Sequence, residues 1–380
     1  MKKLLPEVCT IQYGFPFDSA KFSDSNGMPL IRIRDVVRGY SETYTTEEYK
    51  SEYIVHENDL LIGMDGEFNI AKWGKTPALL NQRVCRLAPK DSIDKDYLFY
   101  FMPIALKRIE EKTPFVTVKH LSAKELNKIE IPVLSLEEQR KIAETLSKVD
   151  ELIAFREQQL AKLDELVKAR FVEMFGDLVA PQCEYPELKL VDICADADDI
   201  KCGPFGTQLN RDEYKAKGVA VWEIPQINSG FSEMPTHFIT EEKAVILNAY
   251  SIEPGDIAMS RKGNVGKCGL FPENLKKGII HSDVLRIRVD KRKVDSCFMM
   301  YQLHFSEAVK RQIEMVSSGA IMAGINVTKL KQIKVRIPEL ENQRMFAAFV
   351  ERVDQQKQTV QQSLDKLELM KKALMQEYFG

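Results

Sequence analysis

Two long stretches of the chain carry apolar residues at alternating spacings of four and three, which is typical of one narrow stripe along an α-helix. They cover residues 135–177 and 339–380, and neither contains a glycine or proline before its closing Phe-Gly pair. Ser135, followed three residues later by Glu138, matches the capping box that begins many helices. We therefore predict two helices of about 40 residues, each roughly 60 Å long.

The apolar stripes also predict where the helices make contact. The expected contact residues are Ile142, Leu146, Val149, Leu160, Leu163, Phe346, Val350, Val353, Leu364 and Leu367. Four basic residues interrupt the stripes: Arg156, Arg170, Lys357 and Lys371. A small domain alone cannot bury so long a stripe, so we expect the two helices to pair with each other as an antiparallel coiled coil. Two separate exposed helices, or a stripe that binds an outside partner, remain alternatives.

The remaining residues, 1–134 and 178–338, mix short β-rich runs with turn signals. Alternating apolar and polar residues predict strands at 29–34, 220–224 and 284–289. One helix is expected in each block, around 96–111 and 295–315. Neither block shows the regular strand-helix alternation of a doubly wound parallel sheet, so both are predicted to be α+β domains.

The two halves of the chain resemble each other. Gln139-Arg140 and Gln343-Arg344 stand 204 positions apart, and the same offset separates the two Phe-Gly pairs. Further upstream, VCRL at 84–87 resembles VLRI at 284–287. Because the matches keep one order, we predict a tandem duplication with pseudo-twofold symmetry. It comprises globular domains at 1–134 and 178–338, each followed by a long helix, at 135–177 and 339–380.

Composition narrows the class of protein. Hydrophobic residues make up 44% of the chain, and 54 basic and 56 acidic residues give a net charge of −2. This balance lacks the strongly basic footprint of a protein that holds nucleic acid unaided. No apolar run approaches the roughly 20 residues of a membrane-spanning helix. Seven scattered cysteines without paired spacing favour reduced thiols in the cytoplasm over disulfides or a zinc site.

None of the candidate catalytic motifs in this sequence is complete. The segment from Gly263 to Cys268 resembles a phosphate-binding loop, but Arg261 and Cys268 stand where that motif needs glycine and Ser or Thr. Asp65 and Glu67 could suggest a nuclease pair, yet the second half has Lys262 and Asn264 at the corresponding places. The five histidines show no spacing of metal ligands. We therefore expect neither catalysis nor a metal or cofactor.

The glycine-bearing loops of both domains offer chemistry for DNA. Arg and Lys can donate to guanine edges or phosphates, and Asn can pair bidentately with adenine. Ordinary surface residues remain the alternative reading. The candidate DNA-contacting residues are Asn69, Lys72, Lys75 and Arg83 in the first domain and Arg261, Lys262, Asn264 and Lys267 in the second.

Taken in order, these fragments resemble the specificity subunit of type I restriction-modification systems over nearly the full length. The resemblance rests on NDLLIGMDGEFNIAKW and LLNQRVCRL in the first block, GPFGTQL and GDIAMSRKGNVGKCGL in the second, and the EEQR and ENQR helix starts. It implies two target-recognition domains that each read one half of a bipartite double-stranded DNA site, with the helix pair as a ruler for the gap. It also implies two bound methyltransferase subunits and, through them, motor-nuclease subunits.

The repeated pairs Gln139-Arg140 and Gln343-Arg344 are candidate parts of the methyltransferase-binding surfaces. The alternative is that they only stabilise the start of each helix or its junction with the domain. Two other functions remain open. One is a coiled-coil adaptor that joins protein-binding domains without DNA, and the other is the specificity subunit of a modification-only defence complex.

Overall fold

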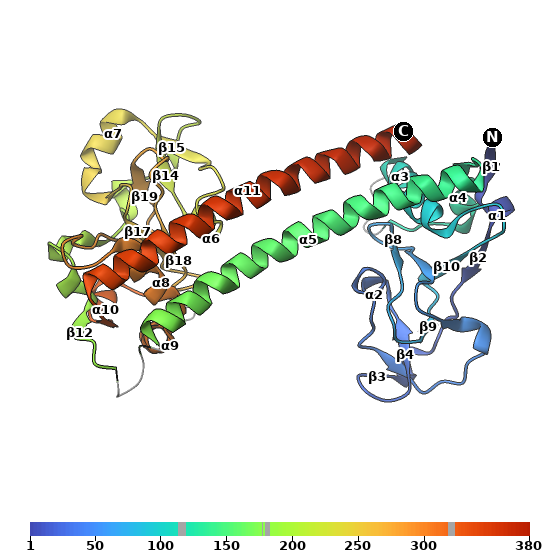
Figure 1. Cartoon of the computed structure of the whole chain (residues 1–380), viewed down its shortest axis with the longest axis horizontal. Coiled ribbons are helices and arrows are strands. Elements are labelled where there is room, and N and C mark those ends of the chain that lie inside the picture. Colours follow the sequence, from blue (N-terminus) through green and yellow to red (C-terminus); the bar gives the residue numbers. More distant parts are fainter. Residues whose placement is uncertain (113–118, 177, 179–182, 318–323) are drawn as a thin grey trace. The chain divides into compact units, whose positions relative to one another are not determined.

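The computed structural model describes residues 1–112, 119–176, 178, 183–317 and 324–380. The chain divides into two compact units, residues 1–158 with 361–380 and residues 159–360. The division falls inside the two long helices, so each unit holds one globular domain and one end of each helix (Figure 1).

Among its described residues, the first unit contains three sheets and four α-helices of its own. Its strands are β1 (Lys2–Leu4), β2 (Cys9–Tyr13), β3 (Phe22–Ser23), β4 (Met28–Ile31), β5 (Tyr44–Thr45), β6 (Ile54–Val55), β7 (Leu60–Gly63), β8 (Asn69–Lys72), β9 (Ala78–Leu80), β10 (Val84–Pro89) and β11 (Glu130–Pro132). Its helices are α1 (Leu5–Val8), α2 (Ile33–Arg38), α3 (Lys95–Lys112) and α4 (Ala123–Leu126), joined by parts of α5 (Leu136–Phe175) and α11 (Leu340–Phe379).

The second unit repeats this inventory closely. Its strands are β12 (Glu187–Lys189), β13 (Ile200–Cys202), β14 (Val219–Trp222), β15 (His237–Ile239), β16 (Ser251–Ile252), β17 (Ile257–Ser260), β18 (Cys268–Leu270), β19 (Gly278–Ile280), β20 (Val284–Ile287) and β21 (Lys334–Arg336). Its own helices are α6 (Ile224–Asn228), α7 (Glu241–Ile246), α8 (Ser296–Phe305), α9 (Glu307–Ser317) and α10 (Val327–Lys331).

The order of strands confirms the duplication. One four-stranded sheet runs β2-β10-β7-β8 in the first unit, and its counterpart runs β13-β20-β17-β18 in the second. A parallel pair, β4 with β9, likewise corresponds to β14 with β19, and a two-stranded sheet, β1 with β11, corresponds to β12 with β21. The chain is thus an α+β tandem repeat.

Several predicted element boundaries were wrong. The strand expected at 29–34 ends at Ile31, because the Asp35 carboxylate accepts a hydrogen bond from the Arg32 backbone N–H (2.9 Å) and helix α2 begins there. The strand at 220–224 stops at Trp222 for the same kind of reason, since the Glu223 N–H donates to the Gln226 side chain (3.1 Å). These local hydrogen bonds override the alternating pattern.

Two further boundaries differ in the second unit. The helix expected at 295–315 is divided at Ser306, which has an extended backbone, so α8 and α9 are separate helices. Strand β20 ends at Ile287, opposite Ile200, where its partner strand β13 begins; the Arg288 N–H still donates to the Asp199 carbonyl (3.1 Å), just beyond the paired residues. The helix expected at 96–111 is confirmed as α3.

Both long helices are present, each with 40 residues. At the start of α5 the Glu138 N–H donates to the Ser135 hydroxyl (3.3 Å), and the Ser135 N–H donates to the Glu138 carboxylate (3.0 Å). Hydrogen bonding from Ser135 lowers the pKa of the Glu138 carboxyl. The capping box predicted from the sequence is therefore formed.

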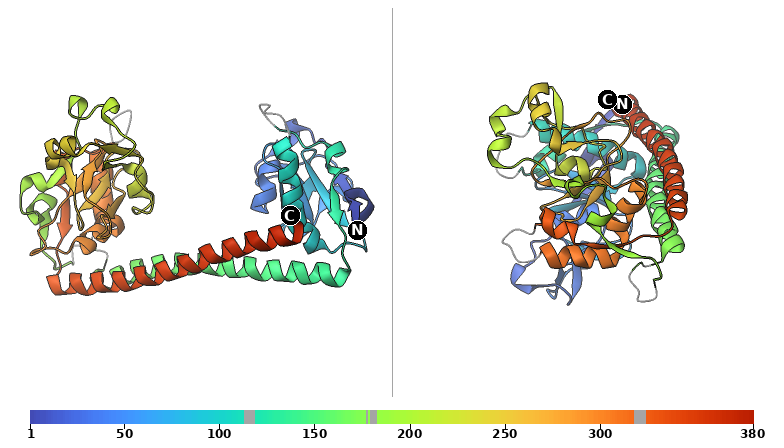
Figure 2. Two further views of the ribbon diagram at one scale, coloured as in Figure 1. Left: turned by 90° about the horizontal axis from the view of Figure 1, so that it is seen from above. Right: turned by 90° about the vertical axis from the view of Figure 1, so that its left-hand side faces the viewer.

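Within each unit, α5 and α11 lie side by side and antiparallel (Figures 1 and 2). In the first unit Lys371 forms an ion pair with Asp150 (2.6 Å), and the Arg156 guanidinium donates to the Ser363 hydroxyl (3.2 Å). In the second unit Lys357 forms an ion pair with Asp164. As the residue numbers increase along α5, those of the contacting residues on α11 decrease, so the two helices are antiparallel.

The expected contact residues of the helices fall into two groups. The buried residues are Leu146, Val149, Phe346, Val350, Val353 and Leu364, and the half-buried ones are Ile142, Leu160, Leu163 and Leu367. Residues near the helix ends join the cores of the globular domains as well. In the first unit, Phe379 packs edge-on against Tyr97 (5.2 Å between ring centroids) and Phe101 (5.8 Å).

The second unit has an aromatic core at the corresponding place. Phe171 and Phe175 of α5 pack on Phe298 of α8 and Phe346 of α11, with ring centroids 4.8–5.9 Å apart. Both domains are therefore built on helix ends that come from distant parts of the sequence. Among the described residues, no helix has the length and apolar character needed to cross a membrane.

Candidate nucleic-acid interface

Two loops lie together at the same place in each domain. They are residues 64–68 and 81–83 in the first domain, and residues 261–267 and 281–283 in the second; we call them the paired loops. In the first domain the Met64 N–H donates to the Arg83 carbonyl (3.0 Å), and in the second the Arg261 N–H donates to the Asp283 carbonyl (2.9 Å). The glycine-bearing loops predicted from the sequence are thus joined to a second loop.

Glycines hold this arrangement at two places. A Cβ atom on Gly14 would lie 2.0 Å from the Asn81 carbonyl oxygen, and one on Gly203 would lie 2.3 Å from the His281 carbonyl oxygen. Real Cβ atoms do not approach so closely, so only glycine allows these backbones to meet. The similarity between GFPF at 14–17 and GPFG at 203–206 therefore has a steric cause.

Beside the paired loops of each domain, an arginine side chain from the sheet donates a hydrogen bond to a backbone carbonyl. Arg86 of β10 donates to the Ile54 carbonyl (2.8 Å), and Arg286 of β20 donates to the Ser251 carbonyl (2.7 Å). Burial, together with the nearby Arg288, lowers the pKa of Arg286. The matching VCRL and VLRI segments thus each carry an arginine that hydrogen-bonds to a nearby backbone carbonyl.

The four candidates of the first domain have different surroundings. Arg83 forms an ion pair with Asp65 (3.2 Å) across the paired loops, and its side chain is 52% exposed. Lys72, at the end of β8, binds Asp96 of α3 (2.8 Å) and covers the Phe99 ring (5.0 Å to the centroid). Asn69 donates to the Glu67 carbonyl (3.1 Å), and Lys75 is exposed beyond β8. Only Arg83 belongs to the paired loops.

The four candidates of the second domain lie in one loop. Arg261 donates to the Ser282 carbonyl (2.9 Å) and covers the exposed Phe205 ring (4.8 Å to the centroid). Lys262 forms an ion pair with Asp283 (2.9 Å). The Asn264 carbonyl accepts from the Lys267 N–H (3.1 Å), which closes a turn. Lys267 also lines a cavity of about 270 Å³ against α8 and α9.

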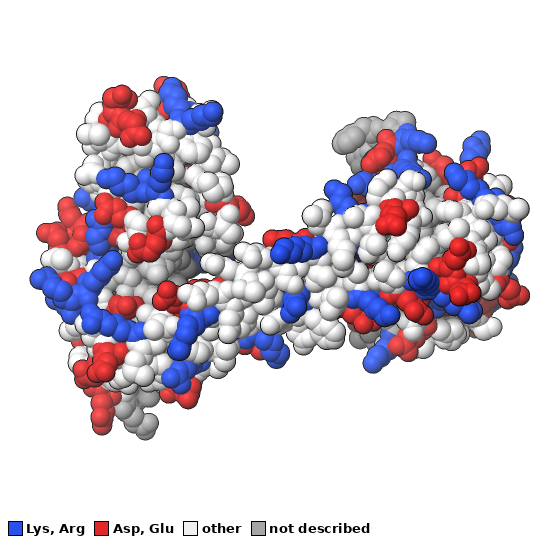
Figure 3. All heavy atoms as spheres, turned by 45° about the horizontal axis from the view of Figure 1, so that its top comes forward, with Lys and Arg blue, Asp and Glu red and all other residues white. Residues whose placement is uncertain are grey.

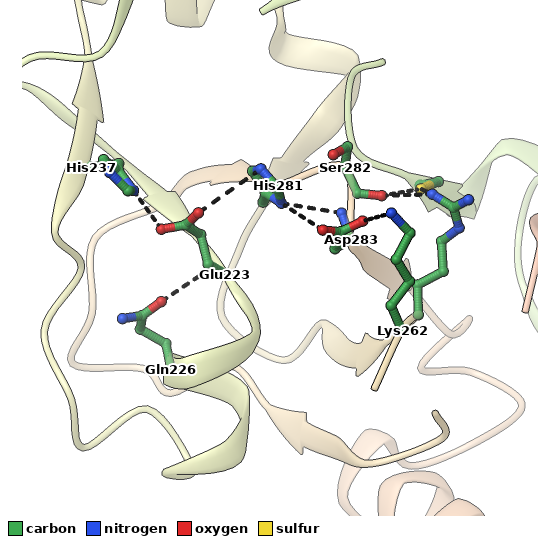
Figure 4. A network of polar contacts seen from close by, with 9 residues as sticks. Glu223, Gln226, His237, Lys262, His281, Ser282 and Asp283 are labelled. Carbon is green, nitrogen blue, oxygen red and sulfur yellow. Dashed lines mark hydrogen bonds and ion pairs between the residues drawn. The ribbon is translucent and has the colours of Figure 1, made fainter. Parts of the chain in front are cut away.

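Figure 4 shows a polar network that extends from these loops and that sequence reasoning missed. Glu223, just after β14, contacts His237 of β15 (2.6 Å) and His281 (3.9 Å). His281 in turn lies 3.8 Å from Asp283. These residues come from separate elements, so no local motif predicts the network. The only sequence signal was the run His281-Ser282-Asp283 after the loop.

The two glutamines at the helix starts are fully buried. Gln139 accepts from the Asp94 N–H (2.8 Å) and donates to the Ser92 and Leu134 carbonyls. Gln343 accepts from the Asp295 N–H (2.9 Å) and donates to the Pro338 carbonyl (2.7 Å). Both side chains tie a long helix to its domain, so they stabilise the junction.

The adjoining arginines are exposed instead. The Arg140 side chain is 66% exposed and lies 3.8 Å from Asp94, and Arg344 is also exposed. On the face drawn in Figure 3, basic and acidic side chains are interspersed over both globular parts. This distribution matches the near-neutral net charge.

Comparison with known proteins gives a consistent result. The chain is 28% identical over 376 residues to the specificity subunit of the type I restriction enzyme EcoBI from Escherichia coli, which covers 92% of this chain and 78% of that protein. It is 24% identical over 379 residues to the MjaVIII specificity subunit from Methanocaldococcus jannaschii, covering 91% and 87%.

The fold agrees with these relatives. The type I restriction-modification S subunit from M. genitalium superposes with a TM-score of 0.60 at 17% identity, covering 100% of this chain and 96% of that structure. The type I restriction modification DNA specificity domain matches residues 1–165 and 199–369, which correspond to the two repeats. The chain belongs to the family of type I restriction modification DNA specificity proteins.

Proposed function

We propose that this chain is the DNA sequence-specificity subunit of a type I restriction-modification complex. The observation that carries this function is the presence of two copies of the specificity domain, each with the same paired loops. Each globular domain reads one half of a bipartite double-stranded DNA site. Two domains with one framework and different loop residues are suited to two different half-sites.

The DNA contacts are proposed to come from the paired loops and the residues beside them. Those residues are Asn69, Lys72, Lys75 and Arg83 in the first domain and Arg261, Lys262, Asn264 and Lys267 in the second. Lys72 has a carboxylate partner in α3, which favours a positioning or phosphate contact over base reading. Alanine at a base-reading position should weaken binding to the cognate site by about 1–3 kcal/mol.

The chain itself is proposed to be non-catalytic and to work with methyltransferase subunits in the cytoplasm. Two methyltransferases per chain are expected, because the duplication offers two similar surfaces at the helix starts. Arg140 and Arg344 are the proposed contacts there, while Gln139 and Gln343 shape those surfaces from inside. Motor-nuclease subunits would join through the methyltransferases. The long helices set the gap between the half-sites.

Methylome sequencing tests this function directly. A host strain is compared with a strain that lacks this gene and with one that carries the gene again on a plasmid. We expect one bipartite methylated motif that disappears with the gene and returns with the plasmid. Methylation that is the same in all three strains would refute the function. Purified chain, mixed with its methyltransferase, should saturate at two methyltransferases per chain; saturation at one would refute the two-surface assignment.

A further inference from the structure

The two domains carry a reversed ion pair at the same structural position. Matching backbone hydrogen bonds place Met64 and Arg83 in the first domain where Arg261 and Asp283 stand in the second. The next residues, Asp65 and Lys262, form equivalent isolated bridges, to His120 and Gly324. Asp65 therefore corresponds to Lys262, and Arg83 corresponds to Asp283.

The charges at these positions are exchanged between the loops. In the first domain the glycine-bearing loop supplies the anion, Asp65, and the other loop supplies the cation, Arg83 (3.2 Å). In the second domain the glycine-bearing loop supplies the cation, Lys262, and the other loop supplies the anion, Asp283 (2.9 Å; Figure 4). The cation has thus moved from one loop to the other.

In both domains the cation is the more exposed partner. The Arg83 side chain is 52% exposed and Asp65 is 18% exposed, while Lys262 is 43% exposed and Asp283 is 27% exposed. Pairs this exposed contribute little to stability. The loops are also already joined by a backbone hydrogen bond in each domain. Asp65 also contacts His120 (2.5 Å), and Asp283 also lies 3.8 Å from His281. Each carboxylate is therefore held in a small polar cluster, from which it fixes the direction of a more exposed cation.

We infer that Arg83 and Lys262 are the specificity-determining residues of their half-sites, and that each reads a guanine. Asp65 and Asp283 are the positioning residues that orient them. This inference rests on the proposed function. It adds the residues, the base, and the reason why the two half-sites differ.

The chemistry of the two cations selects the base. In the major groove guanine presents two adjacent acceptors, O6 and N7, and Arg or Lys is the usual donor to them. Adenine offers only one acceptor there, beside an amino donor that repels a cation. Because Arg83 and Lys262 come from different loops, the guanines should occupy different positions within the two half-sites.

Single substitutions test the reading residues in the complete complex with the methyltransferase. Arg83→Gln should abolish the preference for guanine at one position of one half-site, where Gln can pair with adenine instead, and leave the other half-site unchanged. Lys262→Gln should do the same in the other half-site. In binding competition, wild-type complex should prefer the guanine-containing duplex over its replacements by about 5- to 150-fold, and the variant should lose that preference.

Matched control variants carry the same chemical change elsewhere. Arg38 is 46% exposed and pairs with Glu42 (3.5 Å), so Arg38→Gln controls for Arg83→Gln. Lys334 is 59% exposed and pairs with Glu187 (2.9 Å), so Lys334→Gln controls for Lys262→Gln. Both controls should keep the full wild-type motif.

A reversed pair separates base reading from loop stabilisation. Lys262→Asp combined with Asp283→Arg keeps the attraction between the loops but gives the second domain the polarity of the first. If the pair only stabilised the loops, this variant would methylate the wild-type motif. If Lys262 reads the base, the half-site of the second domain changes while the other stays. If Lys262→Gln lowers the unfolding temperature, its loss of specificity could come from instability. The reversed pair, which keeps the ion pair between the loops, is then the variant that tests base reading.

The possible results separate a failure of the guanine-reading assignment from a failure of the proposed specificity function. If the wild-type chain directs no bipartite motif, the proposed function fails. If the wild-type motif is present but Arg83→Gln, Lys262→Gln and the reversed pair all leave it unchanged, only the inference fails. Loss of discrimination at a base other than guanine would also overturn it.

Discussion

Single residues at the paired loops show which parts of the site can be predicted from sequence. Arg83 and Lys262 are candidates because Arg and Lys in glycine-bearing regions suit DNA, and their contact with DNA stays a prediction. Asp65 was considered only as part of a possible nuclease pair, and neither its ion pair with Arg83 nor that of Asp283 with Lys262 was predicted, since an ion pair between two loops depends on how strands from distant sequence meet. The network from Glu223 to His237 was missed for the same reason. Gln139 and Gln343 were noticed as a repeat, but only the structure shows that they are buried.

Gly203 offers a test of the close backbone approach. Alanine at Gly203 would place a Cβ atom 2.3 Å from the His281 and Ile280 carbonyl oxygens. The backbones must separate, which should lower the free energy of unfolding by about 1–3 kcal/mol. Chemical denaturation measures the change. Gly324→Ala is the control, because its Cβ would meet its nearest atom, the Arg261 carbonyl oxygen, at 3.5 Å and should be tolerated. Equal stability of both variants would contradict this account.

The buried thiols offer a second test at this scale. Burial raises the pKa of Cys85 to about 12 and that of Cys268 to about 12, against about 8.5 for a free thiol. At pH 8 both should remain protonated and unreactive toward an alkylating reagent until their unit unfolds. The half-buried Cys183 should react first. Mass spectrometry after timed alkylation gives the rates; equal rates for Cys85 and Cys183 would be inconsistent with the burial.

At the scale of elements, periodicity was a strong guide only where it was long. The apolar stripe over about ten helical turns left no alternative to a helix, and α5 and α11 differ from the prediction by at most two residues at either end. Most strands have two to five residues, too few for alternation to be distinguished from the start of a helix. There, capping side chains such as Asp35 decided the local structure.

The basic residues within the stripes should fix the register of the helix pair. Asp150 pairs with Lys371 in the first unit and Asp164 with Lys357 in the second. A double-mutant cycle with Asp150→Asn and Lys371→Gln should give a coupling energy of about 0.5–1 kcal/mol, because the pair is partly exposed. Thermal unfolding of the four proteins supplies the values. The same cycle with Asp365 and Lys372, which are both exposed and stand seven positions apart on α11, should give none.

At the scale of the whole molecule, the first unit consists of two separate segments, residues 1–158 and 361–380, so its stability should depend on both. Phe379 lies in the core of the first domain, together with Leu374, Met375 and Tyr378. Deletion of residues 374–380 should therefore destabilise the first unit and leave the second intact. Alkylation of Cys85 should accelerate, while Cys268 stays protected. Acceleration at both thiols, or at neither, would contradict the division of the chain.

If the helix pair sets the gap between the two half-sites, a change in helix length should change that gap. A heptad insertion lengthens a helix by roughly 10 Å and keeps its stripe in phase. Asp150 pairs with Lys371 and Asp164 with Lys357, and antiparallel counting between these two pairs makes insertions after Leu160 and after Val360 equivalent in sequence. The preferred gap should grow by about one to three base pairs, at about 3.4 Å each, with both half-sites unchanged. Methylome sequencing reads the gap; an active variant with the original gap would exclude the helices as ruler.

The split of the first unit between both ends of the sequence also bears on how the protein is made. A ribosome releases residues 159–360, a continuous segment, before it releases residues 361–380. The core of the second unit needs α11 as far as Phe346, Val350 and Val353, while the first unit, although translated earlier, must wait for the later residue Phe379. The first unit therefore cannot follow the usual order, in which an N-terminal domain is completed first. A chain whose synthesis stops early would carry a finished second domain and an open first one.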